Sequence, residues 1–127
     1  MKSQTIIPKG WEKPSAPYSY AVKKGNMVFI AGQVAINEQG ELVGKGDVKA
    51  QTKQILENIQ SCLQAARARL EDVVSVQVFL TDVSSYGPMN EVYRGYFPEN
   101  FPARATVITG LVKEEFLVEI SAVVIMG

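Results

Sequence analysis

The sequence of 127 residues contains no histidine and a single cysteine, Cys62. Without histidine, the chain cannot form a Ser-His-Asp triad, a Cys-His pair or a metal site with histidine ligands. One cysteine cannot form a disulfide within the chain. We therefore expect a fold without disulfides, a site without a metal ion, and chemistry that other residue types carry.

The sequence also lacks an excess of either charge, because its 13 Lys and Arg residues balance its 13 Asp and Glu residues. Proteins that bind nucleic acids usually carry a basic excess or a basic stripe, and the sequence has neither. No apolar run approaches the ~20 residues needed to cross a bilayer. The first residues lack the apolar core of a signal peptide. We expect a cytoplasmic protein that binds neither nucleic acid nor membrane.

Length and composition indicate one globular domain over residues 1–127, with 46% apolar and 20% charged residues. Residues 1–17 are expected to be irregular. Periodicity and turn residues predict strands at Tyr18–Val22, Met27–Ala31, twice within 34–44, and at Val73–Thr81, Ala105–Thr109 and Phe116–Met126, with helices from Asp47 to about Leu70 and after Ser84–Ser85. This order predicts an α+β fold, a mixed sheet with both helices packed on one face.

The two predicted helices each have one apolar side. The first carries Cys62 on its apolar stripe, and the sequence offers that thiol no base or metal partner. We interpret Cys62 as a small buried core residue. The aromatic residues of the second helix, among them Tyr86 and Tyr93, recur at the spacing of one buried face and are also interpreted as core.

Alternation along the strands at 73–81 and 116–126 separates an apolar face from a mixed one. The sequence predicts that Val74, Val76, Val78 and Leu80 face the helices. The opposite face combines apolar residues (Val73, Phe79, Leu117, Val123, Ile125) with polar ones (Ser75, Gln77, Thr81, Glu119, Ser121). Such a face is too apolar for water and too polar for a core, so another subunit is its natural cover.

Arg104 and Glu119 are the charged residues with the clearest functional interpretation. Arg104 opens one C-terminal strand and Glu119 lies in the middle of the next. Antiparallel pairing of these strands would bring the two together as a structural salt bridge, and the pattern alone favours this. Alternatively, Arg104 holds a substrate carboxylate, while Glu119, with a pKa raised by partial burial, activates a water.

The segments "PYSYAV…GNMVFIAGQV", "MNEVYRGYF", "FPARATV" and "VEISAVV" resemble the RidA/YjgF family of enamine/imine deaminases, from about Pro17 to Val124. The resemblance implies a chorismate-mutase-like fold and a homotrimer, in which the sheets form a central barrel and clefts lie between subunits. It also implies hydrolysis of 2-aminoacrylate- or 2-aminocrotonate-type substrates, through the imine, to 2-keto acids and ammonia without a cofactor.

Residue roles follow from the resemblance by position. Arg104 matches the arginine that grips the substrate carboxylate, and Glu119 matches the glutamate that activates the water. Tyr18 matches a tyrosine of the cleft, and Gly32 lies in the turn where backbone approaches the ligand. Asn90 matches a helix asparagine that supports the site. Each of the last three also has a plainer interpretation, as a hairpin aromatic, a bulge glycine and a backbone-binding amide.

The sequence departs from the family pattern at three places. Ala31 stands where a serine is usual, Thr106 where a cysteine is frequent, and "GLV" replaces Leu-Pro in the following loop. Thr106 can still supply a hydroxyl to a substrate, although it also suits a strand without further reason. These departures leave open a larger enamine of the 2-aminomuconate type as substrate.

Two other classes of function compete with a deaminase. One is a trimeric module that binds small carboxylates or a protein without turnover, for which Arg104 would suffice and Glu119 would be superfluous. The other is a ribonuclease, an activity attached to some members of the family. The lack of histidine and of net positive charge argues against a ribonuclease.

Overall fold

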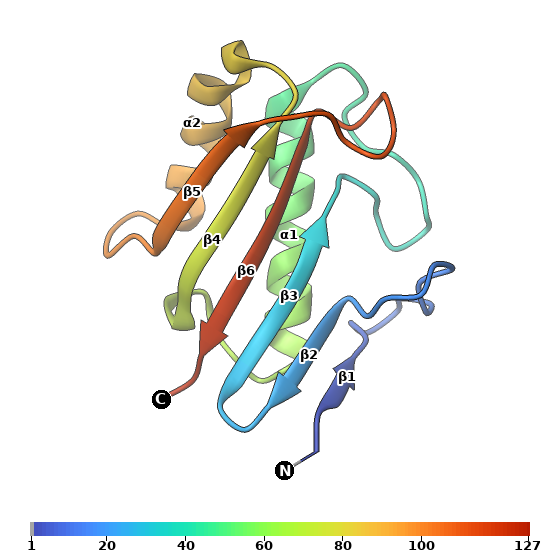
Figure 1. The fold of residues 1–127 in the computed structure, drawn as a ribbon, viewed down its shortest axis with the longest axis vertical. Helices are drawn as coiled ribbons and strands as arrows, with labels where there is room; N and C mark the ends of the chain where they lie inside the picture. The colour runs from blue at the N-terminus through green and yellow to red at the C-terminus, as the bar shows by residue number, and fades with distance from the viewer. Residues whose placement is uncertain (1) are drawn as a thin grey trace.

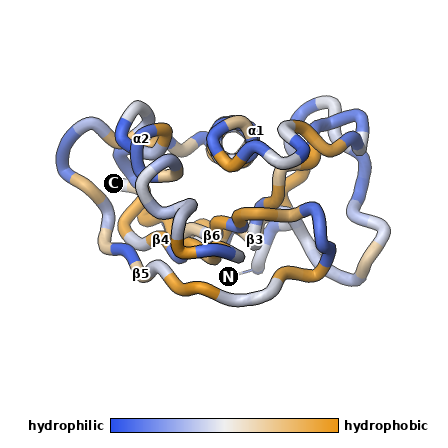
Figure 2. The backbone as a smooth tube through the Cα atoms, turned by 90° about the horizontal axis from the view of Figure 1, so that it is seen from above, coloured by the Kyte–Doolittle hydropathy of each residue, from blue (hydrophilic) through white to orange (hydrophobic). Residues whose placement is uncertain are grey.

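The computed structural model describes residues 2–127. In these residues, a six-stranded sheet has the order β1-β2-β3-β6-β4-β5, and both helices cover one of its faces (Figures 1 and 2). The elements are β1 (Gln4–Ile6), β2 (Ala21–Lys24), β3 (Met27–Gln33), α1 (Val48–Ala65), β4 (Val73–Leu80), α2 (Tyr86–Tyr96), β5 (Ala103–Ile108) and β6 (Val118–Ile125). The predicted α+β fold, with a mixed sheet and two helices on one face, is confirmed.

The N-terminal third departs from the prediction at both ends of the β2–β3 hairpin. Residues 4–6, expected to be irregular, form β1 and pair with β2. The two short strands expected within residues 34–44 are reduced to a single bridge between Ile36 and Leu42. The Asn37 carboxamide oxygen accepts hydrogen bonds from the N–H groups of Gln39 and Glu41. The Asn37 side chain therefore bonds backbone N–H groups of the turn that a strand ladder would otherwise use.

Helix α1 begins as predicted and ends earlier. The Asp47 side chain accepts a hydrogen bond of 3.1 Å from the N–H of Ala50, so the predicted N-cap is confirmed. The helix ends at Ala65 because Arg67 adopts a left-handed conformation with φ of 63°. The N–H of Ala68 then donates to the carbonyl of Leu63 at 2.8 Å, which closes the helix in a Schellman motif.

Helix α2 has a different start from the one predicted. Ser85 precedes the helix but forms no side-chain cap bond. Instead, Asp82 accepts hydrogen bonds from the N–H and the hydroxyl of Ser84, and it caps a 3-10 turn over Val83–Ser85. The cap therefore lies one turn earlier, since the carboxylate accepts both donors of Ser84 at once.

The core lies between the helices and the sheet. Apolar residues from the centre of the sheet pack there against the buried side of α1. The sheet residues are Val76, Val78, Leu80, Val118, Ile120 and Val124, and the helix residues are Ile55, Leu56, Ile59 and Leu63. Cys62 is buried among them, and burial raises the pKa of its thiol to about 12. This confirms the interpretation of Cys62 as a core residue, because a thiol with that pKa is neutral at pH 7.

The start of β4 corrects the predicted alternation. Val73 is 5% exposed and belongs to the core, whereas Val74 is 42% exposed, the reverse of the expectation. The pairing of β4 with β6 shifts register between Val73 and Ser75. The irregularity inverts the alternation for these two residues and leaves the orientation of Val76 as predicted.

The connection from β4 to β5 corrects the predicted strand pairing. Helix α2 carries the chain from the end of β4 back to the start of β5, so these strands run parallel as neighbours. Strand β6 then pairs with β3 and on its other side with β4. Because β4 separates β5 from β6, the antiparallel pairing expected to join Arg104 to Glu119 is wrong.

The left-handed residue after α1 gives a stability prediction. A non-glycine residue with positive φ is strained by its Cβ, at roughly 1–2 kcal/mol, and the Arg67 side chain is exposed. We expect Arg67→Gly to raise the free energy of unfolding by about 1 kcal/mol in urea denaturation. The matched control is Arg69→Gly, because Arg69 has φ of −128° and should gain nothing. Equal effects in both variants would contradict the assignment of strain to Arg67.

Candidate functional site

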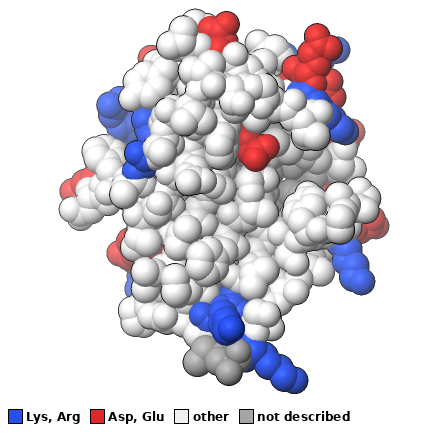
Figure 3. Space-filling model, viewed as in Figure 1, with Lys and Arg blue, Asp and Glu red and all other residues white. Residues whose placement is uncertain are grey.

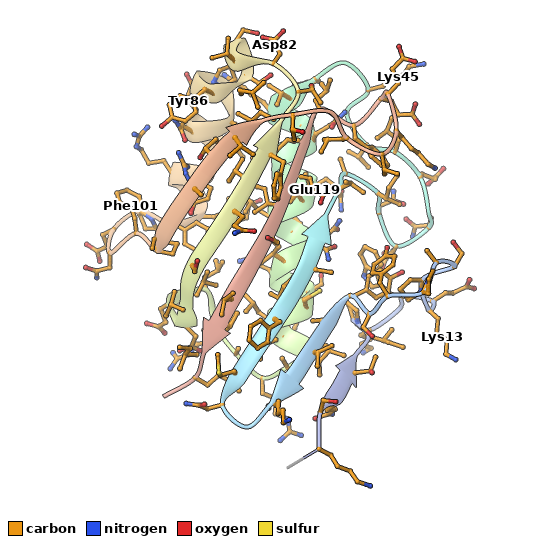
Figure 4. All side chains as sticks on the ribbon, viewed as in Figure 1. Lys13, Lys45, Asp82, Tyr86, Phe101 and Glu119 are labelled. Atoms are coloured by element: carbon orange, nitrogen blue, oxygen red, sulfur yellow. The ribbon has the colours of Figure 1, made fainter. Side chains whose placement is uncertain are left out.

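Glu119 lies in the middle of the sheet face that the helices leave uncovered, which we call the open face (Figure 4). It is paired with Phe79 of β4, and Ser121 beside it is paired with Gln77. The space-filling view shows an isolated acidic group within a broad uncharged surface (Figure 3). The open face also exposes Phe29 (48%), Val107 (45%) and Ile125 (42%). It is therefore the mixed face expected from the sequence.

The absence of a side chain at Gly32 leaves the space that the Glu119 side chain occupies. A Cβ added at Gly32 would contact the Glu119 carboxylate and lie 2.8 Å from its Cδ, closer than real side chains pack. Any larger residue at this position would therefore displace the carboxylate or shift the backbone of β3. The structure brings these two predicted site residues together, from neighbouring strands.

The Glu119 carboxylate has no ion-pair partner within 4.0 Å among residues 2–127, so the salt bridge to Arg104 is not formed within the chain. Partial burial among the open-face residues raises the pKa of Glu119 above its ordinary value. The pKa of this carboxyl therefore lies closer to neutral pH than that of an exposed glutamate. Such a pKa suits a group that takes up and releases a proton.

Arg104 lies at the β5 edge of the sheet and on the other face. Its partner in β4 is Val76, which faces the helices, so the two side chains share that side. The guanidinium stacks over the ring of Tyr93 at 4.8 Å and lies 5.7 Å from the ring of Tyr86. One guanidinium N–H also donates to the Tyr86 hydroxyl at 3.4 Å. Two aromatic rings of α2 thus hold the arginine.

A pocket of about 250 Å³ opens beside this arginine. Its lining residues come from α2, the following loop and β5: Tyr86, Asn90, Tyr93, Arg94, Phe101, Pro102 and Arg104. We call this the arginine pocket. Asn90, predicted as a site residue, therefore joins Arg104 in one cavity. Thr106 follows on the same side of β5, because its partner is Val78 of the core face.

Tyr18 lies apart from both groups. It precedes β2 toward the opposite edge of the sheet and is 53% exposed. Its ring meets that of Tyr20 edge-on at 6.2 Å, and Tyr20 in turn packs against Trp11 at 5.2 Å. The predicted site residues thus fall into three groups in one chain: Glu119 with Gly32, Arg104 with Asn90 and Thr106, and Tyr18 alone.

Five residues that line the arginine pocket are not among the predicted site residues, namely Tyr86, Tyr93, Arg94, Phe101 and Pro102. Their spacing predicts both tyrosines to be core residues, which is confirmed for Tyr93 at 4% exposure and wrong for Tyr86, which is 47% exposed. Their spacing with Asn90, at i, i+4 and i+7, was nevertheless a usable signal, because it places an amide between two hydroxyl-bearing rings on one helical face.

Two classes of site find no support in residues 2–127. No group of three or more Asp, Glu, Cys or His side chains there could hold a metal ion. No helix in that range combines the length and the apolar character that a membrane span requires.

Comparison with known proteins gives one family and several relatives. Residues 11–126 match the family model described as Endoribonuclease L-PSP. A RutC family protein of Pyrococcus abyssi is 45% identical over 124 residues, which cover 97% of each chain. The 3-aminoacrylate deaminase RutC of Acinetobacter baylyi is 42% identical over 123 residues, 97% of this chain and 98% of the relative.

A solved structure agrees with these sequence matches. The crystal structure of E. coli TdcF with bound serine superposes with a TM-score of 0.89 at 29% identity, covering 98% of this chain and 99% of TdcF.

The raised pKa of Glu119 gives a prediction for stability. The folded state binds the proton more tightly than the unfolded state, so stability falls as the pH rises from about 4.5 through the folded-state pKa. Glu119→Gln keeps the shape without the charge. We expect this variant to unfold at a higher temperature than the parent at pH 7, with the difference vanishing toward pH 4.

The control is Glu114→Gln, which changes an exposed glutamate in the loop after β5. It should show no comparable gain at pH 7. A Glu119→Gln variant that is less stable than the parent at pH 7 would show that the carboxylate is stabilised by a charge or donor instead.

Proposed function

Because the chain belongs to the endoribonuclease L-PSP family, which its RidA/YjgF-like motifs indicated, we propose that it hydrolyses imines or enamines of short carboxylic acids. The products are a carbonyl acid and ammonia. The observation that carries this proposal is a pair of charged groups, Arg104 and Glu119, that lack partners of opposite charge within 4.0 Å in the described residues. The relative named 3-aminoacrylate deaminase, 42% identical, supports the class of reaction.

Arg104 binds the carboxylate of the substrate in this proposal. Its guanidinium is held by two rings and therefore loses little freedom when a ligand binds. A planar guanidinium donates two parallel hydrogen bonds to a carboxylate. Asn90 lines the same pocket and supplies a further polar contact, while Thr106 lies two residues along β5 on the same side of the strand as Arg104.

Glu119 acts on water. An enamine first takes a proton at carbon and becomes an imine. Glu119 then removes a proton from a water molecule as the water oxygen attacks the imine carbon, and it passes that proton to the nitrogen, which gives an amino alcohol. Glu119 next takes the proton of the new hydroxyl group and delivers it to the amino nitrogen, so that the carbon–nitrogen bond breaks and ammonia leaves as the carbonyl forms. A carboxyl with a raised pKa suits both transfers. The steps require no metal or organic cofactor.

The two groups meet between subunits. Arg104 and Glu119 lie on opposite faces of one sheet, so one chain cannot bring them to the same substrate. A second copy that covers the open face would hide its exposed Phe29, Val107 and Ile125. We propose a homotrimer in which three sheets form a central barrel. Each cleft then combines Glu119, Gly32 and Tyr18 of one copy with Arg104, Asn90 and Thr106 of the next.

Ammonia release tests the proposed reaction, with 2-aminoacrylate and 3-aminoacrylate generated in situ as separate substrates. Losing one partner of a buried charge pair costs about 2–5 kcal/mol, and lysine lacks the planar fork. We therefore expect Arg104→Lys to lower kcat/KM at least about thirtyfold. Glu119→Gln should still bind pyruvate in calorimetry while turnover falls at least about a hundredfold.

Arg67→Lys and Glu114→Gln are the matched controls, since both change exposed residues outside the site. Parental turnover in Arg104→Lys would reduce the arginine to a structural residue. Binding of pyruvate without ammonia release from either substrate, in the parent itself, would favour a carboxylate-binding module. Cleavage of RNA that requires neither residue would favour the activity in the family's description.

Complementation tests the shared cleft. Each of Arg104→Lys and Glu119→Gln should be inactive alone, but a mixed trimer contains one cleft with an intact Arg104 from one chain and an intact Glu119 from the other. Random reassembly of equal amounts gives mixed trimers in about three quarters of cases, with one intact cleft of three. We expect about a quarter of the parental activity to return. No recovery in trimers shown to be mixed would contradict a site between subunits.

A further inference from the structure

The arginine pocket contains a second cation that the proposed reaction does not use. Arg94 lies on α2 one turn after Asn90, and both border the same cavity of about 250 Å³ as Arg104. No Asp or Glu is among the lining residues. Two arginines therefore border one small space whose lining contains no acidic side chain.

The surroundings of Arg94 leave its charge available. Glu91, one turn earlier on the same helix, is in an ion pair with Lys49 at 2.6 Å, and the charge of Arg94 makes only a smaller contribution to lowering the pKa of this carboxyl. Within residues 2–127, Arg94 has no ion pair within 4.0 Å. An anion in the pocket would therefore not have to displace an existing partner of Arg94.

The pocket is also lined by three neutral residues that carry hydrogen-bond donors, Tyr86, Asn90 and Tyr93. The Tyr93 hydroxyl is the one fully buried side-chain oxygen or nitrogen atom in the described residues that lacks a hydrogen-bond partner. The Asn90 amide and the Tyr86 hydroxyl border the same space. An orphaned buried hydroxyl costs free energy unless a ligand or water satisfies it. The Tyr93 ring lies 4.8 Å from the Arg104 guanidinium, so a monocarboxylate bound by Arg104 has Tyr93 as a neighbour but leaves Arg94 without a use.

We propose that the pocket is built for a dianion, so that the preferred substrates are imines or enamines of dicarboxylic acids. Arg104 holds the carboxylate next to the imine carbon, and Arg94 holds the distal carboxylate. The cavity of about 250 Å³, roughly eight water volumes, has room for the imine of a four-carbon oxo-diacid. Water adds to its C=N bond, and the products are the oxo-diacid and ammonia. This inference rests on the proposed function.

The reaction that supplies such a substrate follows from its chemistry. An imine of an oxo-diacid arises when a two-electron oxidant removes hydrogen from the Cα–N bond of an acidic amino acid. An enzyme of that class, an oxidase or dehydrogenase of amino diacids, would release the compound that this pocket takes.

The binding of two acids that the enzyme cannot hydrolyse tests whether the pocket prefers a ligand with two carboxylates to a ligand with one. Succinate and butyrate have the same number of carbon atoms and differ in one carboxylate. Arg94 is exposed, so solvent weakens its contribution. We expect calorimetry at low salt to give a dissociation constant about fivefold to tenfold lower for succinate than for butyrate. The preference should shrink in 0.5 M NaCl, because salt screens an exposed charge.

Substitutions assign the preference to its residue. Arg94→Gln should remove the preference for succinate and leave butyrate affinity within about twofold of the parent. Arg104→Lys should weaken both acids. Arg67→Gln, which removes an exposed arginine outside the pocket, should change neither. Equal affinities of the parent for the two acids, or a succinate preference that survives Arg94→Gln, would overturn the proposal.

Kinetics separates this inference from the proposed function. Imines are generated by an amino-acid oxidase from aspartate and from 2-aminobutyrate, and kcat/KM is compared for the two. The parent should favour the aspartate-derived imine by about fivefold or more, and Arg94→Gln should erase that ratio. If neither imine is hydrolysed, the deaminase proposal fails, while the succinate measurement still decides the dianion site. If both are hydrolysed equally, the dianion proposal alone fails.

Discussion

The parallel pairing of β4 with β5 is the constraint on which the arrangement of the site depends. Helix α2 fills the crossover between these strands and packs on the same face as α1 (Figure 2). The crossover places β5 at the edge of the sheet and leaves β6 to pair with the other side of β4. Arg104 is thereby turned toward the aromatic rings of α2, while Glu119 faces away from the helices. The packing of α2 thus divides the candidate functional groups between the two faces of the sheet.

A buried amide holds the second half of this arrangement in register. Gln51 of α1 is fully buried, and its NH₂ group donates to the carbonyls of Gly44 at 3.1 Å and Glu115 at 3.0 Å. Its carbonyl oxygen accepts from the N–H of Leu117 at 2.9 Å. The loop that leads into β6 is therefore fixed to α1 two residues before Glu119. The position of the carboxylate follows from a helix on the opposite side of the sheet.

The candidate site residues include side chains that do not serve the stability of the single chain. Burial raises the pKa of Glu119, so its charge lowers stability near neutral pH. The Tyr93 hydroxyl is buried without a partner. Arg104 is held by aromatic rings, and no carboxylate of residues 2–127 lies within 4.0 Å of its guanidinium. Groups of this kind persist where a ligand or a second subunit completes them.

The sequence by itself determined the two helices, five of the six strands and the identity of the charged candidates. Asp47 marked the start of α1, the spacing of Ile55, Leu56 and Ile59 marked its buried side, and Cys62 fell in the core as expected. These features are local, because a helix cap and an apolar stripe need only neighbouring residues. The motif around Arg104 likewise indicated the family before the fold was considered.

Tertiary structure decided what those residues face. The register shift that exchanges Val73 and Val74 depends on how β4 meets β6, and no alternation within β4 reveals it. Arg104 and Glu119 lie on β5 and β6, which are consecutive strands in the sequence. In the sheet these two strands are not neighbours, because β4 pairs between them. The arginine pocket is lined by residues of both α2 and β5. The packing of α2 beside β5 therefore decides that Arg94 lies near Arg104. Pairing and packing are long-range choices, and a periodicity read along the chain does not contain them.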